Sequence, residues 1–143
     1  MKKMINCGCA TGWTKFAPML SRLVIGLSFL LHGLQKVQGD SAIGFFSQVG
    51  IPAPGLLGPL VTWVEILAGL ALILGLMTHL ASKLLVVVML VAVFTVHLGS
   101  GGFLTASGGP ELPLIIIAGL VNILAFGPGM WALDKRFCKN CKA

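Results

Sequence analysis

Seven ionisable side chains lie within or beside long apolar stretches of this sequence. Two of them, Arg22 and Lys83, lie near the ends of their stretches, and the other five are candidate site residues. They are His32, Lys36, Glu65, His97 and Glu111. A charge at the centre of a bilayer costs about 2.5–3.5 kcal/mol on insertion scales, so such residues usually face the protein interior and mark a functional site. Imidazole, ammonium and carboxyl groups bind polar ligands and transfer protons. We predict catalytic roles for Glu65 and His97, and ligand-binding roles for His32, Lys36 and Glu111.

Each of these side chains also has a structural interpretation. Glu65 would act as a buried polar clamp that fixes the helix register. His97 would be an ordinary interfacial histidine. Glu111 would stabilise a helix N-terminus, where a carboxylate is favourable.

The four cysteines form two short pairs. Cys7 and Cys9 lie near the N-terminus, and Cys138 and Cys141 lie near the C-terminus. C-x-x-C is a metal or redox spacing, and four thiolates suffice for tetrahedral zinc or an iron–sulfur cluster. We therefore predict that the four cysteines bind metal. C-x-C is an unusual metal-binding spacing, however, and the pairs would have to meet across the protein, so redox-active or lipidated thiols and free thiols remain alternatives.

The elements that position these residues are membrane spans. Of 143 residues, 57% are hydrophobic and 10% are charged, whereas soluble domains carry about 25% charged residues. The apolar stretches 16–36, 59–77, 80–98 and 112–126 predict four transmembrane helices. Gly127-Pro128-Gly129 ends the last one. Nucleic acid is not expected as a partner, because the basic residues flank the spans.

The distribution of Lys and Arg predicts the orientation. Nine of the ten basic residues fall on one side of a four-span chain, and Lys36 alone falls on the other. The positive-inside rule then places both termini in the cytoplasm of a multi-pass protein of the cell (inner or plasma) membrane. We expect Arg22 and Lys83 to extend toward the cytoplasmic surface. The predicted domains are a cytoplasmic segment 1–15, a membrane domain 16–134 and a basic tail 135–143.

The first outer loop contains a further helix. Asp40 and Ser41 can cap it, it would run through Val49, and Gly50 with Pro52 would end it. The predicted fold is therefore all-α, a four-transmembrane-helix bundle with a short interfacial helix in the first outer loop.

This topology brings the five ionisable residues to one leaflet. His32 and Lys36 are four residues apart and share a helix face. Glu65 lies six residues after Pro59, about 9 Å along a helix. We predict a polar pocket in the outer leaflet, with Glu65 facing His32, Lys36 or His97 rather than lipid.

The sequence resembles the DoxX family from about residue 20 to residue 134. The resemblance rests on sequence segments in matching order, namely Arg22-Leu23 with Gly26, His32-Gly33-Leu34-Gln35-Lys36, Phe45-Phe46, Gly50-Ile51-Pro52-Ala53-Pro54, Glu65 with Gly69 and Gly75, Phe94-Thr95-Val96-His97, and Gly127-Pro128-Gly129 with Leu133-Asp134. It implies a four-helix membrane protein, and some members of the family are linked to membrane redox complexes, so the resemblance determines the fold better than the function. The cysteine pairs are not part of the family pattern.

Three functions are compatible with these features. The first is a quinone-linked subunit of a membrane redox system, without haem or flavin motifs of its own and so dependent on a redox partner protein. The second is a small anion or thiol transporter, which with four spans would need to form a homo-oligomer. The third is a membrane scaffold or assembly protein without its own chemistry.

Overall fold

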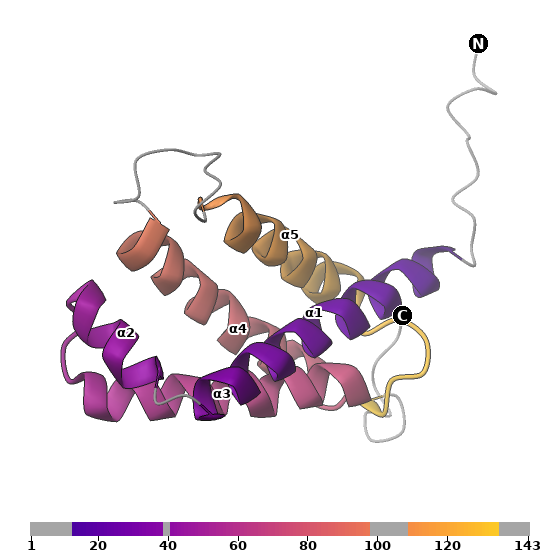
Figure 1. Ribbon diagram of the computed structural model, residues 1–143. Helices are drawn as coiled ribbons and strands as arrows, with labels where there is room; N and C mark the ends of the chain where they lie inside the picture. Colours follow the sequence, from indigo (N-terminus) through magenta and orange to yellow (C-terminus); the bar gives the residue numbers. More distant parts are fainter. Residues whose placement is uncertain (1–12, 39–40, 98–108, 135–143) are drawn as a thin grey trace, which may run out of the picture.

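A computed structural model describes residues 13–38, 41–97 and 109–134. Within these ranges the protein is all-α (Figure 1), as the sequence predicts. Its helices are α1 (Trp13–Gln38), α2 (Ser41–Val49), α3 (Pro54–Leu74), α4 (Thr78–Ala92), the π-helical turn η1 (Val93–His97) and α5 (Glu111–Phe126). Both cysteine pairs, Asp40 and most of the second outer loop lie outside the described residues.

The four long helices run alternately up and down. α1 packs against α3 and α5, and α4 packs against the same two helices, so they form a closed ring. The start of α1, the end of α3, the start of α4 and the end of α5 gather at one end, here called the Asp134 end. The opposite end, where α1 finishes, is called the Lys36 end.

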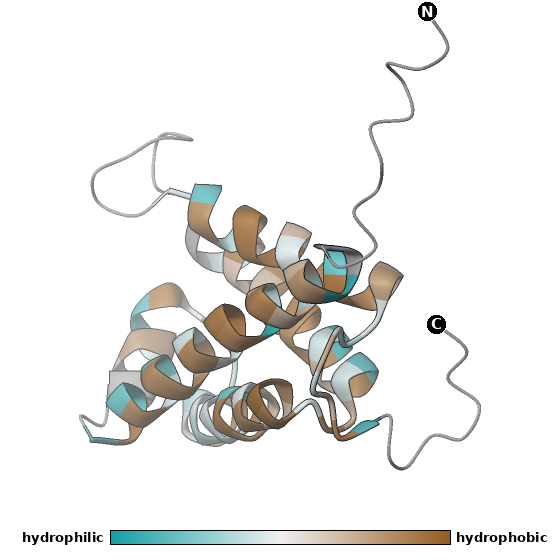
Figure 2. Ribbon diagram, turned by 90° about the vertical axis from the view of Figure 1, so that its right-hand side faces the viewer, coloured by the Kyte–Doolittle hydropathy of each residue, from teal (hydrophilic) through white to brown (hydrophobic). Residues whose placement is uncertain are grey.

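The outer faces of the helices are apolar, which is the pattern of a protein surrounded by lipid. Much of the helical ribbon in Figure 2 is brown, the colour of hydrophobic residues, and many large hydrophobic side chains are exposed. α1, α3 and α4 with the start of η1 are long and apolar enough to span a membrane, and only about a third of each such stretch is buried in the protein. α5 is a shorter apolar helix of 16 residues. The chain is an integral membrane protein with a four-helix bundle.

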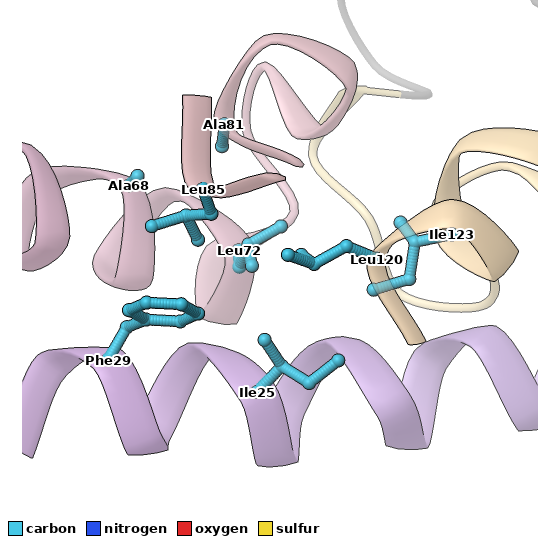
Figure 3. Packing of buried hydrophobic residues seen from close by; sticks show 8 residues of the cluster. All are labelled: Ile25, Phe29, Ala68, Leu72, Ala81, Leu85, Leu120 and Ile123. Carbon is cyan, nitrogen blue, oxygen red and sulfur yellow. The ribbon is translucent and has the colours of Figure 1, made fainter. Parts of the chain in front are cut away.

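The bundle is tightest between α1 and α3. A Cβ atom at Gly26 would lie 2.8 Å from the Gly69 carbonyl oxygen, and one at Gly69 would lie 2.8 Å from the Gly26 oxygen. Small residues let membrane helices approach closely, and dispersion contacts then hold them together. The core beside this crossing contains Ile25, Phe29, Ala68, Leu72, Ala81, Leu85, Leu120 and Ile123 (Figure 3).

The predicted interfacial helix is present as α2. It begins at Ser41 and ends at Val49, at the predicted bounds. Gly50 adopts φ 76°, and the Ile51 N–H reaches back to the Phe46 carbonyl at 3.0 Å, the Schellman arrangement that ends many helices. Phe46 is buried against the bundle, whereas Ile43 and Phe45 are largely exposed.

α3 begins at Pro54, five residues before the predicted start at Pro59. Both prolines suit a first helical turn, so the sequence alone did not decide between them. Ala53, in a left-handed conformation, accepts the first hydrogen bonds from the amides of Leu56 and Leu57. Glu65 therefore lies about 16 Å along its helix rather than about 9 Å. α3 ends at Leu74, three residues before the predicted Met77, because Gly75 takes φ 67°.

Residues 127–134 cross the Asp134 end as an irregular segment of turns and bends, here called the strap. The Met130 amide donates to the Lys15 carbonyl at 3.1 Å, which ties the strap to α1. The Asp134 amide donates to the Gly75 carbonyl at 2.8 Å, which ties it to the end of α3. Gly129 lies so close to α1 that a Cβ atom would come within 2.7 Å of the Lys15 oxygen.

The Asp134 side chain ties the strap to α4. Its two carboxylate oxygens accept hydrogen bonds from the amides of Met77 and Thr78, at 2.6 and 2.8 Å. These amides are among the unpaired donors of a helix N-terminus, where the helix dipole also favours an anion. Asp134 therefore caps α4 from 56 residues away in the chain.

The strap also covers Arg22, which was predicted to lie at the surface. We predicted that this side chain would extend to the surface, but this was wrong, because it is 1% exposed. The strap covers it, and Arg22 Nη2 donates to the Trp131 carbonyl at 3.4 Å. Arg22 Nη1 fills the space beside Gly75 that a Cβ atom would need. Lys83, in contrast, is exposed.

Candidate functional site

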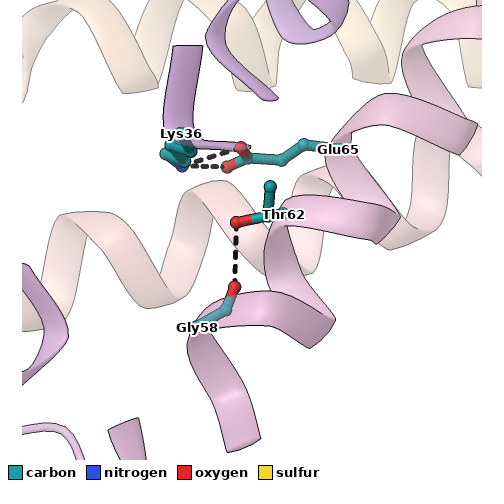
Figure 4. A network of polar contacts seen from close by, with 4 residues as sticks. All are labelled: Lys36, Gly58, Thr62 and Glu65. Atoms are coloured by element: carbon teal, nitrogen blue, oxygen red, sulfur yellow. Dashed lines mark hydrogen bonds and ion pairs between the residues drawn. The ribbon is translucent and has the colours of Figure 1, made fainter. Parts of the chain in front are cut away.

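A partly buried ion pair joins α1 and α3 (Figure 4). Lys36 Nζ lies 2.7 Å from both carboxylate oxygens of Glu65. The Glu65 side chain is 4% exposed and the Lys36 side chain is 30% exposed. Of the three partners predicted for Glu65, the structure therefore selects Lys36, and Glu65 faces the bundle rather than lipid.

The face of α3 that carries Glu65 explains its position. Thr62, Glu65, Ala68, Gly69 and Leu72 are all buried and recur at helical spacing. The Thr62 hydroxyl donates to the Gly58 carbonyl of its own helix at 2.9 Å, so it does not compete for Glu65 (Figure 4).

Close packing of α1 against α3 also brings Lys36 near Glu65. One turn before Lys36, a Cβ atom at Gly33 would lie 2.5 Å from Ile66 Cγ1. Gly33 therefore brings this part of α1 against the segment of α3 that follows Glu65. Lys36 lies in the last turn of α1, where the helix dipole favours a cation.

The ion pair forms part of the wall of a cavity. The cavity has a volume of about 440 Å³ and lies between α2, α3 and the outer part of α4 with η1. Its lining residues are Lys36, Phe45, Phe46, Ile51, Leu57, Leu60, Val61, Val64, Glu65, Leu84, Val87, Val88, Met89, Val91, Ala92 and Thr95. Apart from Lys36, Glu65 and Thr95, these side chains are apolar. An apolar cavity of this size with a few polar groups in fixed positions is typical of a small-molecule site.

One wall of the cavity is irregular. α4 changes at Val93 into the π-helical turn η1, and π-turns occur often at functional sites. Thr95 lies in this turn, lines the cavity, and donates its hydroxyl to the Val91 carbonyl at 2.7 Å. Of the lining residues, only Lys36 and Glu65 were predicted as site residues from the sequence, because Thr95 and the apolar side chains are ordinary for a membrane helix.

For the other three predicted site residues, the described part of the structure shows no hydrogen bond to Lys36 or Glu65. His32 is exposed on α1, although it lies one turn from Lys36. His97 ends η1, and its side chain lies outside the described part of the structure. Glu111 opens α5 as predicted, and its buried Oε2 has no partner among the described residues. The roles of His32, His97 and Glu111 stay predictions.

The predicted metal ligands Cys7, Cys9, Cys138 and Cys141 lie outside the described residues. Within the described ranges, no group of three or more His, Cys, Asp or Glu side chains is arranged to hold a metal ion. The prediction for the cysteines is therefore neither supported nor contradicted by the membrane domain.

The fold and the paired charges define a small four-helix integral membrane protein with an ion pair beside an apolar cavity. Residues 17–98 match the DoxX family model, and the chain belongs to the DoxX family. This confirms the resemblance drawn from the sequence motifs. The matched region contains both partners of the ion pair and every residue that lines the cavity.

Relatives of similar length support the membership. A membrane protein of Mycobacterium tuberculosis is 35% identical over 133 residues, which cover 85% of this chain and 82% of that protein. A Bacillus subtilis protein named "Putative oxidoreductase CatD" is 27% identical over 125 residues, covering 87% and 89%. A Haemophilus influenzae protein is 34% identical over 123 residues, covering 83% and 89%. No solved structure matches the chain.

Proposed function

We propose that this protein is the quinone-binding subunit of a membrane redox system. The observation that carries the proposal is the position of Lys36 and Glu65 in the wall of an otherwise apolar cavity. A membrane quinone has an apolar tail and a small head with carbonyl oxygens. The apolar helices would bind the tail, and the charged pair would bind the head. The name of the Bacillus subtilis relative is in keeping with this class of function.

The shape of the cavity supports a ligand that lies along the membrane normal. Its α4 lining extends from Leu84 to Ala92 and continues to Thr95 in η1. At 1.5 Å per residue this covers about 16 Å, roughly half of the hydrocarbon core. A ligand head at Lys36 therefore leaves room for a tail that points toward the middle of the bilayer.

The chemistry of the pair suits a quinone head. Lys36 Nζ has three donor hydrogens and would donate one of them to a head carbonyl oxygen while it keeps Glu65 as a partner. Reduction of a quinone takes up two electrons and two protons, and Glu65 would deliver or receive one of these protons. The electrons would come from or pass to a redox partner protein.

A binding experiment tests this proposal. The protein is purified in mild detergent, and the quinone extracted from it is quantified against protein. The purified chain is then titrated with decylubiquinone and with menadione. We expect bound quinone in the wild type and affinity lowered about 10- to 100-fold in Lys36→Met, the loss of a hydrogen bond to a charged group being worth about 1.5–3 kcal/mol.

The control variant is Lys83→Met, which removes an exposed lysine near the Asp134 end and should bind like the wild type. Glu65→Gln should retain binding but lose proton transfer in a reconstituted quinone-reduction assay. If the wild type neither contains quinone nor binds either probe, the proposal is wrong.

A further inference from the structure

A cluster of buried polar side chains lies at the Asp134 end of the bundle, at the opposite end from the ion pair. It consists of Arg22 of α1 with Thr78 and Ser82 of α4, and each of these residues is at most 1% exposed. Arg22 Nε and Nη1, Thr78 Oγ1 and Ser82 Oγ have no hydrogen-bond partner among the described residues. Since buried polar groups in folded proteins are nearly always hydrogen-bonded, these four atoms indicate a bound species that is not part of the chain.

The three side chains come together because α3, α4 and the strap meet at this end. Arg22 Nη1 lies beside Gly75, which ends α3 three residues before Thr78. Thr78 and Ser82 are four residues apart and share a face of α4, and both belong to the buried side of that helix. The strap covers Arg22 through Trp131 and bonds to the start of α4 through Asp134. The guanidinium group and the two hydroxyls are therefore enclosed at one end of the helix ring.

The charge of this cluster distinguishes an anion from water. Among the described residues, no carboxylate lies within ion-pair distance of Arg22. Both oxygens of Asp134 accept hydrogen bonds from the amides of Met77 and Thr78. Burial of a cation without a close counter-ion is costly. Water would satisfy the hydrogen bonds of the cluster, whereas an anion would satisfy the hydrogen bonds and also neutralise the charge.

We propose that Arg22, Thr78 and Ser82 bind a small monovalent inorganic anion, of the size of chloride, inside the Asp134 end. Guanidinium N–H groups and hydroxyls are hydrogen-bond donors to anions. The N-terminus of α4, where Thr78 lies, adds a partial positive charge. The phosphate of a lipid headgroup does not fit, because its glycerol would have to pass into the bundle with it and Arg22 is enclosed.

The site is separate from the proposed quinone cavity and would have its own effect on the fold. α1 and α4 lie across the ring from each other, since each packs mainly against α3 and α5. An anion held by Arg22 from one helix and by two hydroxyls from the other would link this diagonal pair. Binding to the folded state alone stabilises a protein, so the anion should raise the stability of the bundle.

The first test measures chloride binding to the full chain in detergent. Sodium chloride is exchanged stepwise for sodium gluconate at constant ionic strength, and thermal unfolding and the linewidth of the chloride NMR signal are followed. We expect the melting temperature to rise with chloride, and the linewidth to titrate as one site, because gluconate is too large for an enclosed cluster. A melting temperature and a linewidth that are indifferent to this exchange would overturn the proposal.

Variants locate the binding site. Arg22→Met should abolish the effects of chloride, and Ser82→Ala should weaken chloride binding about 10- to 100-fold, as expected for loss of a hydrogen bond to a charged group. Lys83→Met is the matched control, since it removes an exposed positive charge next to Ser82 and should bind chloride like the wild type. Chloride effects that persist in Arg22→Met, or unchanged binding in Ser82→Ala, would contradict the proposed site. Ser82→Ala decides the question alone if Arg22→Met does not fold.

The same variants distinguish an anion from trapped water. In chloride-free buffer Arg22→Met should be at least as stable as the wild type, because the buried charge then has no counter-ion. The wild type should gain stability over Arg22→Met only as chloride is added. A stability difference that does not depend on chloride would mean that water fills the cluster, and the proposal would be wrong.

Discussion

Lys36 Nζ is equidistant, at 2.7 Å, from the two carboxylate oxygens of Glu65, yet the two side chains differ sevenfold in exposure. The anion is enclosed and the cation lies partly open to the cavity. The pair is therefore both a structural link between α1 and α3 and a polar group that a ligand can reach. Separate measurements can distinguish these two roles.

The structural role predicts unequal effects of single and double substitutions. Lys36→Met should destabilise the bundle by about 1–3 kcal/mol, less than the 3–5 kcal/mol of a fully buried pair, because it leaves a carboxylate without its partner. Lys36→Met combined with Glu65→Gln should recover part of this loss, since the remaining side chain is neutral. Unfolding free energies in mixed micelles test the prediction, and a double variant less stable than Lys36→Met would contradict it.

The close approach of α1 and α3 predicts that one added methyl group lowers the stability of the protein strongly. Gly69→Ala should destabilise the protein by about 1–3 kcal/mol, because its Cβ atom would collide with backbone atoms of Gly26 and Leu30. Gly55→Ala, also in α3, meets nothing within 4 Å and should be neutral or stabilising by up to about 1 kcal/mol. Thermal unfolding of both variants in the same detergent makes the comparison.

The cavity predicts that a larger side chain should displace a ligand. Ala92→Phe fills space between α3 and α4 without changing either charge. It should abolish binding of decylubiquinone while the protein still elutes as a folded species. Ala118→Phe is the matched control, because Ala118 is exposed on α5 outside the cavity. Equal loss of binding in both variants would indicate a general packing defect instead.

The cap at α4 predicts the effect of Asp134 on stability. Asp134→Ala removes two hydrogen bonds to helix N-terminal amides and should cost about 0.5–2 kcal/mol. Asp134→Asn keeps one acceptor, so its unfolding free energy should lie between those of the wild type and Asp134→Ala. Hydrogen exchange should show faster exchange at Met77 and Thr78 in Asp134→Ala, and unchanged exchange at those amides would refute the cap.

For Arg22 we predict that removing the charge does not lower stability, in contrast to Asp134. Its Nε and Nη1 atoms are buried and lack partners among the described residues, and burial of a charge that is poorly paired is costly. Arg22→Met keeps an unbranched apolar side chain and removes the guanidinium group, and in chloride-free buffer it should leave the unfolding free energy unchanged or raise it. A loss above about 2 kcal/mol would mean that Arg22 has a partner outside the described residues.

Much of the fold could be predicted from the sequence, because its signals are strong. Apolar length located all four spans, the turn residues around 41–52 located α2, and the small residues after Glu65 indicated its buried face. Contacts made by the strap could not be predicted. Arg22 looks like a surface residue from its position in α1, and only a segment about 109 residues away covers it.

Part of the site could also be predicted, because an ionisable residue within an apolar span is a strong signal in the sequence. The cost of burying Glu65 demanded a partner, and Lys36 was among the three candidates. Spacing places His32 and Lys36 on the same side of α1, and the choice between them depends on how α1 is rotated against α3, to which the close contacts of Gly26 and Gly33 contribute. The cavity depends on where α2 rests and on the π-helical turn, and neither leaves a distinctive pattern in the sequence.

The unequal lengths of the helices have a consequence for the surrounding bilayer. α1 has 26 residues and α5 has 16, so they are about 39 and 24 Å long, against a hydrocarbon core of about 30 Å. A helix that is too long tilts, and one that is too short draws the two leaflets together. We therefore expect the bilayer to be thinner along α5 than along α1, so that its thickness changes around the circumference of one small protein.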